Sequence, residues 1–193
     1  MPFYSAIAEQ EVTRVIPSLA NQGDPAYWHV VPVVPGVELH FALLNPDTGP
    51  MGRIIAALTG SPSYHVETWI EDDAPATVQA IARAGLGLPY DWDGALLAYQ
   101  NTGYHTAHRE FCSGWAWEML QPVLHGLQPY PNPGKLMLDV AAMTGQRLAL
   151  PPVPPVSIGQ ADLDYLDQLH DAGKIACGIQ QQVLAALPPS NIA

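Results

Sequence analysis

The stretch that decides the expected fold reads YHVETWI at 64–70, GLGLPYDWDG at 85–94 and FCSGWAWEMLQ at 111–121. The first segment is rich in β-branched and aromatic residues and follows a turn-forming SPS, which predicts a strand. Glycines in the second segment end a helix, and its aspartates suit the N-cap of another. The third segment starts a helical pattern at a cysteine. We therefore expect a strand, a helix boundary and a helix that begins at the cysteine, in that order.

The same signals predict the elements on either side of this stretch. Strands are expected at 28–34 and 37–44, and helices at 3–21, 75–84, 94–100 and 134–146. Residues 51–59 are ambiguous between a strand and a short helix. We expect one domain at 1–149, a Pro-rich linker at 150–156 and a C-terminal helical segment at 157–193. The apolar stripe of 157–187 cannot be buried by a short hairpin alone, so it packs back on the domain or docks onto another protein.

Charge and composition exclude several classes of function. The 193 residues carry a formal net charge of −11 with only seven Lys and Arg, which argues against a nucleic-acid partner. The apolar runs are too short for a membrane span, and the N-terminus has no basic start followed by an apolar run. The default expectation is a cytoplasmic protein, with association with a virion and export without a signal as open alternatives.

Two residue types point to thiol chemistry. Cys112 is expected at a helix N-terminus, where the dipole favours thiolate and backbone amides can stabilise an oxyanion. His65 and Glu67 alternate along a strand and so share one of its faces, where a carboxylate can orient an imidazole. The competing interpretations are a buried structural cysteine and a polar strand face at the surface. The second cysteine, Cys177, is expected to pack in the C-terminal helices.

The ordered motifs resemble those of a known family. Tyr64-His65-Val66-Glu67, Gly87-Leu88-Pro89-Tyr90-Asp91 and Phe111-Cys112-Ser113 are similar to segments of circularly permuted papain-like proteins of the NlpC-type superfamily, over residues 37–145. This resemblance implies an α+β fold of permuted papain-like topology, in which a small antiparallel sheet or partial barrel packs against helices. Cys112 would be the nucleophile, His65 the base and Glu67 the orienting residue, with Glu71 as an alternative. Tyr64, Ser113, Tyr90 and His108 are candidates for the substrate cleft.

The implied function is a cysteine hydrolase that cleaves an amide bond through a thioester, with bacterial cell-wall peptides as the leading substrate class. This chemistry needs no cofactor. The open alternatives are a thiol acyltransferase or lipid esterase, and a non-catalytic structural protein of a phage or secreted assembly. Gly114 departs from the family, whose members usually carry an acidic residue there. His105, His108 and Glu110 have spacing that suits a metal site, but we expect them to lie in a loop and to bind no metal.

Overall fold

The computed structural model describes the backbone of residues 27–30, 37–44, 49–59, 63–70, 74–144 and 156–188. Side chains are described for 49–59, 74–143 and 156–188. The predicted helix at 3–21 and nearly all of the predicted linker at 150–156 lie outside the described residues.

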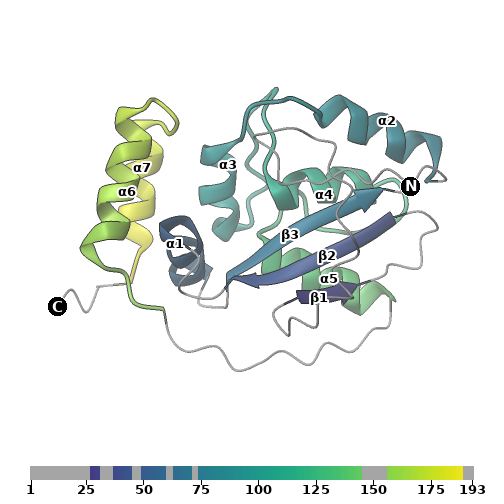
Figure 1. Ribbon diagram of the computed structural model, residues 1–193, viewed down its shortest axis with the longest axis horizontal. Coiled ribbons are helices and arrows are strands. Elements are labelled where there is room, and N and C mark those ends of the chain that lie inside the picture. Colours follow the sequence, from purple (N-terminus) through teal and green to yellow (C-terminus); the bar gives the residue numbers. More distant parts are fainter. Residues whose placement is uncertain are drawn as a thin grey trace.

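Three strands form an antiparallel sheet in the order β1-β2-β3 (Figure 1). They are β1 (Tyr27–Val30), β2 (Val37–Leu44) and β3 (Ser63–Ile70). In the register of β2 and β3, His65 lies opposite Ala42 and Glu67 lies opposite His40. β1 and β3 are the two edges, so these strands form an open sheet and not a barrel.

The described helices are α1 (Pro50–Thr59), α2 (Ala76–Gly85), α3 (Trp92–Leu97), α4 (Cys112–Leu120), α5 (Pro133–Thr144), α6 (Gln160–Asp171) and α7 (Cys177–Ala186). A 3-10 turn, η3 (Ala98–Gln100), follows α3 directly. α1, α4 and α5 all contact β3, and α4 and α5 cover one face of the sheet (Figure 1). The ambiguous segment at 51–59 is therefore helical. None of the helices in the described part of the chain combines the length and apolar character that a bilayer span requires.

The predicted fold class is wrong for the part of the chain whose side chains the structure describes. We expected an α+β fold of permuted papain-like topology, with a small antiparallel sheet or partial barrel. Where backbone and side chains are both described, 62% of the residues are helical and 2% are extended. The extended residues in that part are the short bridge between Tyr90 and Glu110. The physical reason is that the described apolar cores form by packing helix against helix.

Two helical cores account for most of the described buried apolar surface. The first lies among α2, α4 and α5 and contains Val78, Trp115, Met119, Leu120, Leu136, Met137 and Val140. The second joins α1 and α3 to the C-terminal hairpin and contains Ile54, Leu96, Leu97, Leu166, Leu169, Ile179 and Val183. Leu166 and Val183 are fully buried, and burial of each such side chain contributes about 1.5–3 kcal/mol.

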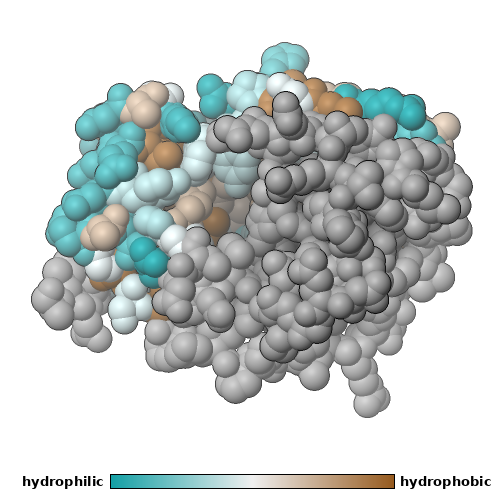
Figure 2. Space-filling model, viewed as in Figure 1, coloured by the Kyte–Doolittle hydropathy of each residue, from teal (hydrophilic) through white to brown (hydrophobic). Residues whose placement is uncertain are grey.

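The C-terminal hairpin of α6 and α7 packs back on the rest of the protein (Figure 1). The chain turns at Gly173, whose φ of 67° suits a residue without a side chain. Arg53 of α1 contacts the carboxylate of Asp162 at the start of α6, with a distance of 2.7 Å between Nη2 and Oδ1. The outward side of the hairpin is mostly hydrophilic (Figure 2). α1 and α3 thus cover the apolar stripe that suggested a docking role.

Candidate functional site

A short parallel bridge brings the second and third sequence motifs together. The amide of Asp91 donates to the carbonyl oxygen of Glu110 at 2.8 Å, and the amide of Glu110 donates to that of Pro89 at 3.0 Å. The bridge pairs Tyr90 with Glu110, two residues before Cys112. It therefore brings the Pro-Tyr-Asp segment beside the start of α4.

Cys112 is the first residue of α4, as the sequence predicts. Phe111 caps the helix with extended backbone, and the amide of Trp115 makes the first helical bond by donating to the carbonyl of Phe111 at 2.9 Å. The amides of the preceding three residues have no acceptor within the helix, and the helix dipole places positive charge there. The cysteine is nearly buried, with 8% of its surface exposed.

The Tyr90 phenol and the Cys112 thiol lie close enough to interact electrostatically. Burial raises the pKa of the Tyr90 phenol well above its ordinary value, and the adjacent Cys112 raises it further. The phenol therefore keeps its proton across the neutral range and is available as a hydrogen-bond donor to the sulfur. The structure thus places one of the predicted cleft residues against the predicted nucleophile.

His65, Glu67 and Tyr64 all lie on β3, which contacts α4. The strand that carries the predicted base is therefore a direct neighbour of the helix that begins at Cys112. Their side chains lie outside the described side chains, so the proton-transfer and orienting roles stay predictions. The same holds for Tyr64 as a cleft residue and for Glu71 as the alternative to Glu67, since Glu71 lies outside the described residues.

Ser113 and His108 are two further predicted cleft residues whose side chains the structure describes. Ser113 is completely buried, and its hydroxyl donates to the carbonyl oxygen of Pro131 at 2.8 Å. It therefore ties α4 to the segment before α5, and its role as a cleft residue stays a prediction. His108 is exposed on the loop at 101–109 with a φ of 61°. Cys177, expected to be packed, is exposed at the first turn of α7.

The packing of Phe111 explains why glycine follows the Cys-Ser pair. A Cβ atom at Gly114 would lie 2.7 Å from Cε1 of the Phe111 ring. That ring is 2% exposed and packs against Ala95 and Ala98. Any side chain at position 114 would displace the residue that caps the cysteine helix.

Asp91 fixes the loop that precedes the cysteine. The carboxylate is fully buried and caps α3, because Oδ1 accepts from the amide of Gly94 at 3.0 Å. Its other oxygen accepts from the amide of Thr106 at 2.7 Å. One buried side chain therefore holds both the start of α3 and the middle of the loop, a structural role that the sequence predicts only in part.

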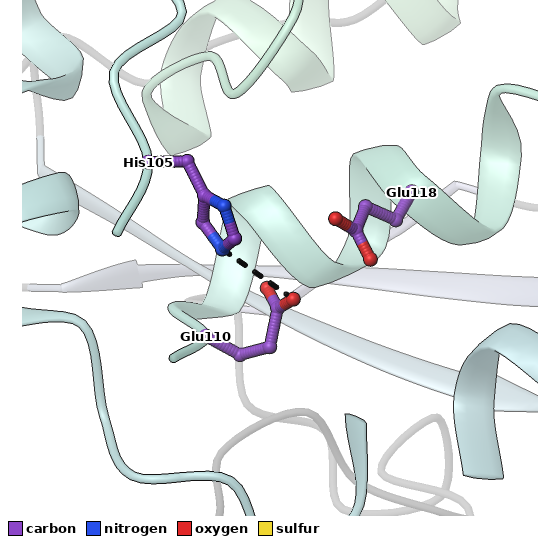
Figure 3. Close-up of side chains that lie close together, drawn as sticks. All are labelled: His105, Glu110 and Glu118. Carbon is purple, nitrogen blue, oxygen red and sulfur yellow. Dashed lines mark ion pairs between the residues drawn. The ribbon is translucent and has the colours of Figure 1, made fainter. Parts of the chain in front are cut away.

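A cluster of titratable side chains includes Glu110 of the Tyr90–Glu110 bridge (Figure 3). Single donor atoms of His105, Glu110 and Glu118 lie within 4.8 Å of one another. His105 Nε2 is 3.5 Å from Oε1 of Glu110. Burial and the adjacent Glu118 raise the pKa of Glu110 to about 8.

Tyr130 holds this cluster in place. Its hydroxyl donates to Oε1 of Glu118 at 2.6 Å, and its ring stacks on His105 at 4.3 Å between centroids and 4° between planes. Burial and the bond to Glu118 raise the pKa of Tyr130. The sequence spacing groups His105 and Glu110 with His108, which is exposed on the loop. The spacing does not indicate Glu118, because this residue lies in α4 and only the folded chain brings it near the other two.

Comparisons of the chain with protein-family models, with curated proteins and with solved structures find no match. Its function is therefore inferred from the residues described above.

Proposed function

We propose that this protein is a cysteine hydrolase that cleaves an amide bond through a thioester on Cys112. The observation that carries the proposal is the position of this thiol at the first residue of α4, with the Tyr90 phenol near it. A helix N-terminus favours the thiolate and supplies amides that have no helical acceptor. The contact between α4 and β3, the strand of His65, supports a thiol–imidazole pair.

The proposed reaction has two steps. The sulfur of Cys112 attacks the substrate carbonyl carbon while His65 accepts the thiol proton, and the resulting imidazolium returns that proton to the leaving amine. Water, deprotonated by His65, then attacks the thioester, releases the acid and regenerates the thiol. Glu67 orients the imidazole in both steps.

Hydrogen-bond donors near the sulfur stabilise the oxyanion of each tetrahedral intermediate. The first-turn amides of α4 point toward the helix N-terminus, and the Tyr90 hydroxyl is a protonated donor at the same place. Loss of one such donor costs about 100- to 1,000-fold in turnover in a well-studied protease. Tyr90 is therefore proposed as an oxyanion donor as well as a residue of the turn.

Bacterial cell-wall peptides are the proposed substrate class. The support is the order of the three motifs at 64–67, 87–91 and 111–113. The net charge of −11 disfavours strongly anionic substrates and is compatible with neutral or cationic peptides. Purified muropeptides are the natural probe, with release of an amine and an acid followed by mass spectrometry.

Thiol labelling tests the proposal without knowledge of the substrate. The native protein is treated with iodoacetamide between pH 5 and 9, and both cysteines are mapped by mass spectrometry. Exposed Cys177 is an internal reference for an accessible thiol. We expect Cys112 to label faster than Cys177 below pH 7 although it is 8% exposed, because a larger fraction is thiolate.

The control pair is His65→Ala and His108→Ala. His65→Ala is expected to abolish the low-pH reactivity of Cys112, whereas His108→Ala, on the exposed loop, leaves it unchanged. Slower labelling of Cys112 than of Cys177 at every pH, with no effect of His65→Ala, contradicts the proposal. That result would favour a structural protein.

A further inference from the structure

We propose that His105, Glu110 and Glu118 form a binding site for a divalent transition-metal ion of the zinc class, separate from the thiol chemistry of Cys112. The side chains come from the loop at 101–109, the Tyr90–Glu110 bridge and the second turn of α4. Figure 3 shows them directed toward one another. The site uses no residue of the proposed hydrolytic mechanism.

The distances suit a site that closes slightly around its ion. One donor atom of each residue lies within 4.8 Å of the other two, and His105 Nε2 is 3.5 Å from Oε1 of Glu110. Bonds of about 2.0–2.1 Å in tetrahedral geometry place donor atoms about 3.4 Å apart. The histidine–glutamate pair already has this spacing, and Glu118 needs a movement on the order of 1 Å, within the reach of a side chain.

The burial of Glu110 independently points to a cation. Its side chain is 10% exposed, and its Oε2 is fully buried with no hydrogen-bond partner. In the described part of the chain, no lysine or arginine pairs with Glu110 or Glu118. His105 is the basic side chain that the described residues place against Glu110, and it reaches Oε1 and not Oε2. A buried carboxylate oxygen without a partner is costly, and a bound cation would supply that partner.

The surrounding residues hold the donors in place before any ion binds. Tyr130 donates to Oε1 of Glu118 and stacks on the His105 ring. His105 Nε2–H donates to the carbonyl oxygen of Arg109 at 2.6 Å, and this bond and its proton are given up when Nε2 binds a metal. Such supporting contacts typically change metal affinity about 10- to 100-fold.

The donor set favours zinc over the hard cations. Calcium and magnesium prefer oxygen ligands throughout, whereas an imidazole nitrogen suits zinc and its neighbours. One imidazole and two carboxylates fill three positions of a tetrahedral ion and leave the fourth for water.

Calorimetric titration tests the site. The full-length protein is treated with EDTA, dialysed and titrated with zinc chloride, with calcium chloride in a parallel run. We expect one zinc ion per chain with a dissociation constant in the micromolar range or tighter, and at least tenfold weaker calcium. His105→Ala and Glu118→Gln should each weaken zinc binding more than tenfold, and Tyr130→Phe should weaken it about tenfold, the lower end of the range for a supporting contact.

Two controls separate this site from other zinc ligands. His108→Ala removes an exposed histidine of the same loop, and Cys112→Ser removes the nearest thiol in sequence. Both are expected to leave affinity unchanged, and circular dichroism checks that each variant is folded. Absence of binding by the folded wild-type protein overturns the proposal. So does binding that is lost in Cys112→Ser but retained in Glu118→Gln.

Discussion

Replacing Glu110 by glutamine should stabilise the protein at alkaline pH. Burial and Glu118 raise the pKa of Glu110 from 4.5 to about 8, so the folded state holds this proton more tightly than the unfolded state. The wild-type protein keeps the full stabilising contribution of this proton below pH 4.5 and loses it as the pH rises through about 8. The glutamine amide of the Glu110→Gln variant carries no charge, so its contribution does not change over this range.

The pKa interval gives the size of the effect. At about 1.4 kcal/mol for each pH unit, the interval corresponds to a ceiling of roughly 5 kcal/mol. We expect a destabilisation of about 2 kcal/mol, because water can enter the site and the Glu118 side chain can move away. Both effects raise the effective dielectric constant around the charge. That difference corresponds to a change of roughly 4–8 °C in melting temperature for a chain of this size.

The assay is urea denaturation of wild type and Glu110→Gln from pH 5 to 9 in EDTA, which keeps metal from the site. The difference in unfolding free energy should be near zero at pH 5 and reach about 2 kcal/mol at pH 9. Leu184→Ala, which trims an exposed side chain, controls for effects unrelated to charge. If the free energies of unfolding of wild type and Glu110→Gln change with pH in the same way, the reasoning is refuted, because ionisation of Glu110 would destabilise only the wild type.

Other variants test the core, the helix cap and the thiol environment. Leu166→Ala should cost about 2–5 kcal/mol in urea denaturation because it opens a cavity between α6 and α1, whereas Leu184→Ala should cost under about 0.5 kcal/mol. Gly114→Ala should cost about 1–3 kcal/mol, because its Cβ would lie 2.7 Å from the Phe111 ring, and a neutral result in thermal denaturation would contradict the packing argument. Tyr90→Phe should slow muropeptide cleavage about 100-fold with little change in melting temperature, and unchanged turnover would rule out Tyr90 as an oxyanion donor.

Local structure could be predicted from the sequence where a single chemical signal decides it. The apolar pattern after Cys112 predicts α4, the aspartates at 91 and 93 predict a cap for α3, and Gly173 predicts the break between α6 and α7. The overall class could not be predicted in this way. Whether the apolar stripe of 157–187 faces α1 and α3 or a partner depends on tertiary packing that composition does not specify.

The candidate site could likewise be predicted only where a local signal exists. The helical pattern predicts Cys112 at a helix start, but it does not show that the Tyr90–Glu110 bridge brings the Tyr90 hydroxyl to the thiol. No local signal joins Glu118 to His105, because one lies in a helix and the other in a loop. The internal position of Ser113 depends on Pro131, which the local motif does not include.

The packing of the C-terminal hairpin on α1 has a consequence for biosynthesis. Arg53 and its partner Asp162 are 109 positions apart in the chain. At about 5–20 residues per second, the ribosome makes the second of these residues roughly 5–20 s after the first. Until then Ile54 and the apolar face of α3 lack the residues of α6 and α7 that bury them, so the core between these helices is completed late. During that interval a chaperone that shields apolar surface would find its target there.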